Sequence, residues 1–230
     1  MVRFHNIAMS FKICKMAKST LAHIVDYPNE PVTFLRQILH AVEEPNFLQA
    51  MNLATVDKEF GVLNRTVLFR GLTEDDCVTY ATQQFTRSCK NLKANNKCAI
   101  TFLFPRVMLP SQGPRPLIWQ VRLIGASAVQ LPESELDLYW EKDELPAQIR
   151  AIIFRTGRPS NYEELKEKHD RFLKDFMESG EPLHRPPTFT AFKIKSLRWD
   201  FLKIGMNQIA DRLQYRLQDD CQWEVMHVSS

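Results

Sequence analysis

Apolar residues recur at helical spacing early in the chain and at strand spacing over most of the remainder. Between Pro31 and Glu44 they return every three or four positions, which predicts a helix that Pro31 begins and Pro45 ends. From residue 50 onward, short β-rich segments predict strands at Met51–Asp57, Leu63–Gly71, Cys77–Thr82, Lys97–Phe104, Ile118–Val129, Thr188–Ile204 and Arg212–Val228. The turn-like residues between the first two strands indicate a hairpin.

Helices and one loop are predicted between these strands. Helical patterns occur at Thr86–Asn96, with Thr86 as the N-cap, and at Pro132–Trp140 and Tyr162–Met177. The four prolines within Pro105–Pro116 predict an exposed loop. Because the strands follow in hairpin order and do not alternate with helices, the pattern predicts a mainly β fold with peripheral helices (α+β). We expect an antiparallel barrel that forms a single domain over residues 26–230.

The composition is that of an ordinary globular chain. Of its 230 residues, 44% are hydrophobic and 25% are charged. The longest apolar runs, such as Ala99–Phe104, fall far short of the roughly 18 residues of a membrane span, so we expect no membrane partner. The net charge of +3 is too small to favour a nucleic-acid partner.

The positive charge is concentrated at the N-terminus. Residues 1–25 hold Arg3, Lys12, Lys15 and Lys18 and no acid, which predicts a basic, flexible arm. Two interpretations stay open: a docking arm of a cytoplasmic protein, or a mitochondrial presequence. The five cysteines form no C-x-x-C pair, which indicates a reduced, intracellular protein without disulfides or a zinc site.

Several kinds of chemistry lack their sequence motif. The chain contains no G-x-x-x-x-G-K-[ST] loop, no G-x-G-x-x-G, no G-x-S-x-G and no H-E-x-x-H. Its histidines lie at positions 5, 23, 40, 169, 184 and 227, without the spacing of metal ligands. We therefore expect neither histidine-centred catalysis nor a bound metal.

Cations at the ends of predicted strands indicate an anion site instead. Arg65 and Arg70 lie on one strand, and Arg87 begins a predicted helix, where backbone N–H groups favour an anion. Gln120 and Arg212 lie on later strands. A phosphate monoester needs two or more guanidinium or hydroxyl donors, and several strand ends together could supply them.

Five motifs in order resemble one known family. They are A-M-N-L-A-T-V-D at 50–57, N-R-T-V-L-F-R-G at 64–71, T-x-x-x-T-R-S-C-K-N-L at 82–92, W-Q-V-R-L-I-G at 119–125 and D-R-L-Q-Y-R at 211–216. Together they resemble the pyridoxine/pyridoxamine 5′-phosphate oxidase family, from about residue 26 to the C-terminus. The N-R-T-V-x-F-R-G version is similar to a divergent FMN-binding branch of it.

The resemblance implies an FMN-binding split β-barrel that forms a homodimer and holds FMN between the two chains. Carried over position by position, it implies the following cofactor-binding residues: Arg65, Thr66, Val67, Leu68, Arg70, Thr82, Arg87, Lys90, Gln120 and Arg212. Arg70 and Tyr139 would also contact the substrate. The flavin carries the chemistry, so no catalytic side chain is expected, and cations beside the ring favour its reduced form.

The departures from the family pattern lie mainly on the substrate side. Asp143 stands in place of an arginine, Ala147 in place of a serine, Leu202 in place of a tryptophan, and Gln208, Ile209 and Ala210 in place of an R-L-H triplet. Losing two guanidinium groups would remove charge-assisted bonds worth about 1.5–3 kcal/mol each. On the cofactor side Ser88 replaces a basic residue, and Leu109–Pro116 is an extra segment. Nearby basic residues could compensate from shifted positions: Lys142, Arg150, Arg155 and Arg158.

Three hypotheses follow from this pattern. The first is an FMN-dependent oxidase that takes a hydride from a B6 vitamer phosphate, uses O2 as the acceptor and yields pyridoxal 5′-phosphate. The second is an FMN oxidoreductase with another substrate, and the third is a non-catalytic homologue that binds flavin or B6 phosphates.

Overall fold

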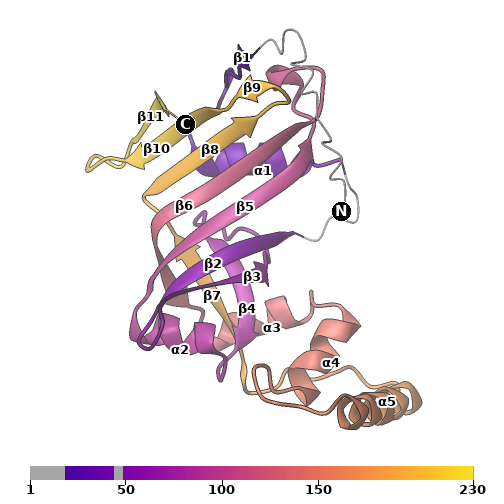
Figure 1. The fold of residues 1–230 in the computed structure, drawn as a ribbon. Helices are drawn as coiled ribbons and strands as arrows, with labels where there is room; N and C mark the ends of the chain where they lie inside the picture. The colour runs from indigo at the N-terminus through magenta and orange to yellow at the C-terminus, as the bar shows by residue number, and fades with distance from the viewer. Residues whose placement is uncertain (1–18, 44–48, 230) are drawn as a thin grey trace, which may run out of the picture.

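The computed structural model describes residues 19–43 and 49–229, so most of the predicted basic arm lies outside the described residues. Its main feature is a nine-stranded sheet in the order β11-β10-β8-β6-β5-β2-β3, with β7 paired to β6 and β4 paired to β7 (Figure 1). The strands of this sheet are β2 (Ala50–Asp57), β3 (Gly61–Leu68), β4 (Val78–Gln83), β5 (Lys97–Val107), β6 (Leu117–Gln130), β7 (Phe189–Lys195), β8 (Arg198–Ile204), β10 (Asp211–Leu217) and β11 (Trp223–Val228). Two short strands, β1 (Thr20–Leu21) and β9 (Gln208–Ile209), form a separate parallel pair.

Strand β6 is where the sheet divides. One edge of β6 pairs with β5, whereas its other edge pairs with β8 along residues 118–124 and with β7 along residues 127–130. Gly125 lies between these two stretches with φ +61°, a left-handed conformation that glycine adopts without steric cost. Every pairing within the nine-stranded sheet is antiparallel, and the sheet does not close on itself. The prediction of a mainly β, antiparallel split barrel is confirmed.

Helix α1 (Pro31–His40) covers one face of this sheet and completes the core. Its Phe34 ring stacks on Phe201 of β8 at a centroid distance of 4.6 Å and meets Trp119 of β6 edge-on at 5.3 Å. All three side chains are almost fully buried. The apolar spacing that predicts this helix is therefore the stripe that packs on the strands.

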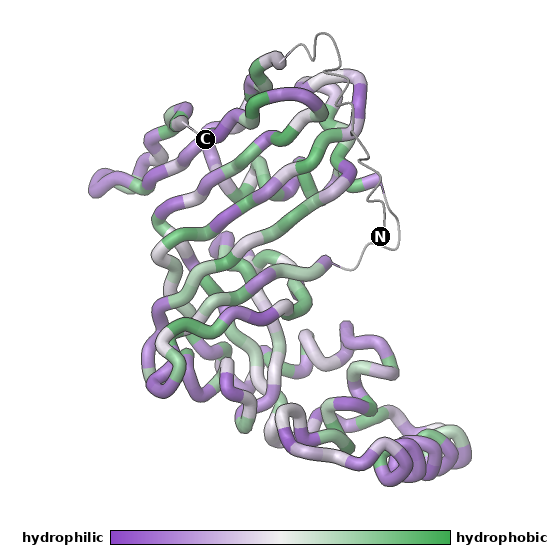
Figure 2. The backbone as a smooth tube through the Cα atoms, viewed as in Figure 1, coloured by the Kyte–Doolittle hydropathy of each residue, from purple (hydrophilic) through white to green (hydrophobic). Residues whose placement is uncertain are grey.

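The other helices lie at the end of the sheet far from β10 and β11 (Figure 1). They are α2 (Arg87–Ala94), α3 (Leu136–Trp140), α4 (Leu145–Ile153) and α5 (Tyr162–Ser179), and a single 3₁₀ turn at Glu133–Glu135 precedes α3. Another 3₁₀ turn, Pro110–Gln112, connects β5 to β6 at the other end of the sheet. Helix α5 has no buried residue and is predominantly hydrophilic along its length (Figure 2). Among the described residues, no helix is both long and apolar enough to cross a bilayer.

Several expectations about elements need correction. The predicted strand Leu63–Gly71 ends at Leu68, so Arg65 lies on β3 but Arg70 lies beyond its end. The loop predicted from Pro105 is wrong at its start, because β5 continues to Val107. The pairing of β5 with β6 shifts register between Phe104 and Val107, and such a bulge tolerates a residue without an N–H group. The predicted strand Thr188–Ile204 is in fact two strands, β7 and β8, which pair one after the other with β6, and the predicted strand Arg212–Val228 is the hairpin β10–β11. Helix α4 was not predicted at all, since its nine residues are too few for a clear period.

The structure shows the state of four cysteines but does not test the predicted single domain. Cys77, Cys89, Cys98 and Cys221 are free, and the first three are buried. Burial raises the pKa of each buried thiol, and that of Cys98 reaches about 12. A single domain over 26–230 stays a prediction.

Candidate functional site

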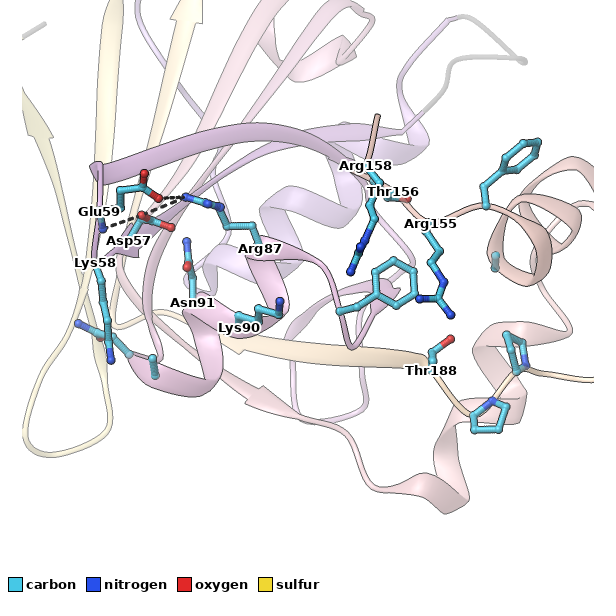
Figure 3. A pocket seen from close by; sticks show the side chains of 18 of the residues that line it. Asp57, Lys58, Glu59, Arg87, Lys90, Asn91, Arg155, Thr156, Arg158 and Thr188 are labelled. Atoms are coloured by element: carbon cyan, nitrogen blue, oxygen red, sulfur yellow. Dashed lines mark hydrogen bonds and ion pairs between the residues drawn. The ribbon is translucent and has the colours of Figure 1, made fainter. Parts of the chain in front are cut away.

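A cavity of about 1270 Å³ opens between α2, the β2–β3 turn and the segment that joins α4 to α5 (Figure 3). We call it the α2 cavity. Arg87 and Lys90 of α2 line one side, and Arg155 and Arg158 of the joining segment line the other. With Lys58 of the β2–β3 turn, five basic side chains line this cavity against the two carboxylates of Asp57 and Glu59, and this excess of positive charge favours an anion that carries more than one charge.

Hydroxyl groups gather at the start of α2. The Thr86 side chain accepts a hydrogen bond from the Cys89 backbone N–H at 3.3 Å, which caps the helix as predicted. Thr82 Oγ1 lies 3.0 Å from Thr86 Oγ1, and Ser88 Oγ lies 3.2 Å from it. The free N–H groups and the dipole of a helix N-terminus add to the attraction for a negative group here.

The Arg87 guanidinium turns toward the β2–β3 turn (Figure 3). Its Nη1 lies 3.1 Å from Glu59 Oε2 and 3.5 Å from Asp57 Oδ1, and its Cζ stands 5.0 Å from the centroid of the Phe60 ring. The Arg87 side chain is 51% exposed, so solvent screens these contacts. An anion in the α2 cavity would compete with two carboxylates for Arg87.

Asp57 is held more firmly than Glu59. Its Oδ1 accepts hydrogen bonds from the backbone N–H groups of Glu59 at 2.9 Å and of Phe60 at 3.0 Å. Burial raises the pKa of Asp57, but these backbone bonds outweigh it and leave the pKa below its ordinary value. The Asp57 carboxylate is therefore a permanent negative charge beside the α2 cavity at neutral pH.

Arg65 lies on the buried face of the β2–β3 hairpin. Its Nη1 donates to the Leu53 carbonyl oxygen at 3.0 Å and to Thr55 Oγ1 at 2.7 Å. Thr55 Oγ1 also accepts from Asn91 Nδ2 of α2 at 3.1 Å. Burial lowers the pKa of Arg65, although a guanidinium stays charged at any physiological pH. Arg65 thus ties the hairpin to α2 from inside the fold.

The neighbours of Arg65 alternate along β3. Thr66 is exposed, and its Oγ1 donates to Asn52 Oδ1 of β2 at 3.0 Å. Val67 and Leu68 are half-buried. These three predicted flavin-lining residues follow the cross-strand register of the hairpin and do not line the α2 cavity.

Gln120 and Arg212 lie on another part of the sheet. Both are directly opposite Leu202, so the three side chains share one face of β6, β8 and β10. This face is turned away from α1, because Phe201, the next residue on β8, packs against that helix. Arg212 Nε is buried and has no hydrogen-bond partner among the described residues.

The predicted cofactor residues therefore form two groups within one chain. The first group, at α2 and the β2–β3 hairpin, contains Arg65, Thr82, Arg87 and Lys90. The second contains Gln120 and Arg212. Strands β3 and β10 lie near opposite ends of the strand order, so a single chain does not bring the two groups together.

Arg70 and Asp143 form a buried ion pair between Nη2 and Oδ1. The Asp143 side chain is 4% exposed and that of Arg70 is 18% exposed. Burial raises the pKa of Asp143, and the Arg70 guanidinium opposes this without cancelling it. The predicted substrate cation Arg70 is thus already paired with the residue that replaces the family's arginine.

The remaining substrate-side positions lie apart from this pair. Tyr139 is half-buried on α3 and packs on a small apolar cluster around Trp140 and Phe189. Gln208 and Ile209 form β9, where they pair with β1 and are exposed.

Some residues of the α2 cavity were not among the predicted site residues. Asn91 lies one helical turn after Arg87, so the predicted helix placed both on one face and could have indicated it. Arg155 and Arg158 reach the cavity on the segment that follows α4, and Thr188 reaches it from the position directly before β7. The sequence had indicated Arg155 and Arg158 only as basic residues that could compensate on the substrate side, and their position at this cavity was not predicted because α4 itself was not predicted.

Comparison with known proteins gives relatives along most of the chain. The pyridoxine/pyridoxamine 5′-phosphate oxidase of Rubrobacter xylanophilus is 30% identical over 172 residues, which are 75% of this chain and 72% of that protein. The enzyme of the same name from Bordetella pertussis is 28% identical over 188 residues, 82% of this chain and 81% of the relative. No protein-family model matches the chain.

Two solved structures share the fold. PhzG from Burkholderia lata, crystallised with tetrahydrophenazine-1-carboxylic acid, superposes with a TM-score of 0.72 at 20% identity, covering 92% of this chain and 100% of that one. A pyridoxamine 5′-phosphate oxidase-related, FMN-binding protein from Nostoc punctiforme gives a TM-score of 0.61 at 19% identity, covering 85% and 95%.

The antiparallel sheet that divides at β6 and these superpositions define the class as the split barrel of the pyridoxamine 5′-phosphate oxidase type. Within that class the sequence relatives are decisive. The chain belongs to the pyridoxine/pyridoxamine 5′-phosphate oxidase family, as a divergent member.

Proposed function

We propose that the protein binds FMN and is an FMN-dependent oxidoreductase. The observation that carries this proposal is the meeting of Arg87 and Lys90 of α2 with Arg155 and Arg158 at one cavity, which the hydroxyls of Thr156 and Thr188 also line. A ribityl phosphate carries two negative charges, and guanidinium groups with hydroxyl and backbone N–H donors match its oxygens.

The residues of this chain fit the cofactor on two independent grounds. The α2 cavity offers cations and the hydroxyls of Thr156 and Thr188 for the phosphate end. Arg212 has a buried Nε that finds no acceptor among the described residues, and a buried donor without a partner is costly. A flavin carbonyl or ring nitrogen would supply the missing acceptor.

The two groups of predicted residues imply that the site is shared between two copies of the chain. Gln120 and Arg212 lie on the sheet face that α1 leaves uncovered, where Leu103 is 54% exposed and Ile118 39% exposed. If these faces pack in a homodimer, one copy would hold the phosphate and the other would contact the ring. Oligomers with closed symmetry commonly build sites in this way.

Bound FMN would supply the hydride acceptor for the substrate, and O2 would take the two electrons from the reduced flavin with release of H2O2. The proposed substrate is a B6 vitamer phosphate, and the product is pyridoxal 5′-phosphate. The chain's own residues would bind and orient: Arg87 and Lys90 at the cofactor phosphate, Arg212 and Gln120 at the ring, and Tyr139 at the substrate. Holding the substrate and the flavin close together in the reactive orientation supplies most of the rate enhancement in such a reaction.

A second candidate is favoured by the Arg70–Asp143 pair. An arginine that is neutralised by a buried carboxylate is a weak anchor for a substrate phosphate, because the anion must displace Asp143 first. The alternative is therefore an FMN oxidoreductase whose substrate carries no phosphate. A flavin- or B6-phosphate-binding protein without catalysis is the third outcome.

The test is the flavin content and the turnover of the purified full chain. We expect yellow protein that releases one FMN per chain on denaturation, forms pyridoxal 5′-phosphate from pyridoxamine 5′-phosphate and consumes O2. Bound FMN without that product would support the second candidate when other reduced substrates bleach and O2 restores the flavin. Colourless protein that gains no thermal stability from added FMN contradicts the whole proposal, since a ligand of the native state must stabilise it.

A further inference from the structure

Two imidazoles and a carboxylate meet where the segment before α1 crosses the C-terminal hairpin. His23 follows β1, Asp211 begins β10 and His227 lies on β11. His227 Nδ1 is 3.1 Å from Asp211 Oδ1 and 3.0 Å from Oδ2, and His23 Nδ1 is 3.5 Å from Oδ2. One ligand atom from each residue lies within 4.8 Å of the other two.

These separations suit a shared ion. A zinc ion bound tetrahedrally at about 2.0–2.1 Å from its ligands spaces them about 3.3 Å apart. The rings of His23 and His227 are stacked, with centroids 5.0 Å apart and an interplanar angle of 27°, so both Nδ1 atoms face the same carboxylate. One histidine would be enough to form a hydrogen bond with Asp211, whereas a metal ion bound to Asp211 would use both histidines as ligands.

The carboxylate is oriented by a group that would remain in place beside an ion. The Ile24 backbone N–H donates to Asp211 Oδ2 at 2.7 Å. Such outer hydrogen bonds fix a metal-binding carboxylate and are typical of built sites. Burial raises the pKa of Asp211, but this bond and the contact with His227 bring it below its ordinary value, so the carboxylate is charged at neutral pH.

The charged neighbours leave room for a cation. Lys203 is paired with Asp211 across the strands, but its ammonium donates to the carbonyl oxygens of His23 at 2.8 Å and of Gln112 at 3.0 Å. It therefore anchors the His23 backbone. Tyr27 meets the His227 ring edge-on at 5.9 Å and adds no charge.

We propose that His23, Asp211 and His227 bind one divalent transition-metal ion that joins the segment before α1 to the β10–β11 hairpin. Two imidazoles with one carboxylate select ions such as Zn²⁺, Co²⁺ or Ni²⁺ over Mg²⁺ and Ca²⁺, which prefer oxygen ligands alone. The site lies on the opposite face of β10 from Arg212, because the two residues are neighbours on one strand. Its role is to fix the strand that carries Arg212, separately from the proposed flavin chemistry.

The experiment uses the full chain as purified, stripped with a chelator and titrated with Co²⁺ alone. We expect one Co²⁺ per chain, visible ligand-field bands of a four- or five-coordinate site, and a rise in the melting temperature. His227→Gln and His23→Gln should each weaken Co²⁺ binding at least about tenfold, since losing a mere outer partner already costs that much. Flavin content or the far-UV spectrum of each variant reports that it has folded.

His169→Gln is the matched control. His169 also has Nδ1 beside a carboxylate, 3.0 Å from Asp170 Oδ1, but the described residues place no second histidine there. This variant should bind Co²⁺ as the wild type does. Equal Co²⁺ affinity of wild type and His227→Gln, or a wild type without ligand-field bands, would overturn the proposal.

Discussion

Arg70 and Asp143 are joined in a buried ion pair that links the end of the β2–β3 hairpin to the loop between α3 and α4. Two positions that the family resemblance assigns to the substrate phosphate thus neutralise each other in this chain. Removing either partner leaves a charge in a site shielded from water, which is more costly than the pair itself.

The first prediction concerns stability. Arg70→Ala should lower the free energy of unfolding by about 3 kcal/mol, because it leaves the 4%-exposed Asp143 without its counter-ion. Urea unfolding monitored by circular dichroism measures this. Arg171→Ala is the control, since its ion pair with Glu167 on α5 is open to solvent and its loss should not shift the midpoint. Equal midpoints for the two variants would mean that the buried pair contributes nothing.

The second prediction concerns the substrate. Asp143→Asn keeps the size of the side chain but releases the charge of Arg70, so a phosphorylated substrate gains a charge-assisted bond. Such a bond is worth about 1.5 kcal/mol or more, which corresponds to roughly a tenfold lower KM for pyridoxamine 5′-phosphate. Steady-state kinetics of both proteins give the comparison, with Asp137→Asn, a change at an exposed side chain of α3, as the control. An unchanged KM in Asp143→Asn would separate Arg70 from the substrate phosphate.

The third prediction tests the cofactor phosphate. Arg87→Ala should raise the Kd for FMN about ten- to a hundredfold, because one or two charge-assisted bonds to the phosphate are lost. Quenching of flavin fluorescence on binding measures this Kd. Arg171→Ala removes the same side chain from an exposed helix outside the α2 cavity and should leave the Kd unchanged. If riboflavin, which lacks the phosphate, loses as much affinity in Arg87→Ala as FMN does, Arg87 does not contact the phosphate.

The fourth prediction concerns acid. The folded pKa of Asp57 lies below its ordinary value of 3.8, so folding favours the ionised form. This contribution to stability is complete above pH 3.8 and is lost as the pH falls below it through the folded pKa. Asp57→Asn, which can still accept the two backbone hydrogen bonds, should therefore lose stability less steeply in that range.

Urea midpoints at a series of pH values provide the measurement for Asp57. Asp75 and Asp211 also have pKa values below their ordinary value, so the slope should become shallower and not vanish. Asp219→Asn, an exposed change between β10 and β11, should retain the wild-type slope. A slope in Asp57→Asn as steep as in the wild type contradicts the assignment.

The local elements could be predicted where a pattern was long or carried a cap. The apolar stripe that predicted α1 is the face on which Phe34 contacts Trp119 and Phe201. Thr86 caps α2, as its position predicted. Pro105 misled the prediction, because a strand continues through a bulge when the register shifts at that point. Whether a strand continues through such a bulge depends on the strand with which it pairs.

The sequence predicted individual residues of the candidate site, but it did not predict how these residues are arranged in space. The motifs named Arg65, Arg87 and Arg212, yet only the pairing of strands shows that Arg65 turns inward to Thr55 and that Arg212 lies on a distant strand. The pairing of Arg70 with Asp143 had no local signal, since their 73-residue separation in sequence is bridged by the packing of α3 and α4 beside the hairpin.

The sequence by itself determined most of the strand positions, the antiparallel order and the family, because each depends on periodicity and on motifs read along the chain. The tertiary structure alone decided which charges meet. His23, Asp211 and His227 have no ligand spacing along the chain, and the spacing argued against a metal. They converge because β10 pairs with β11 while Ile24 is held against Asp211, and such contacts between distant segments arise only when the chain folds.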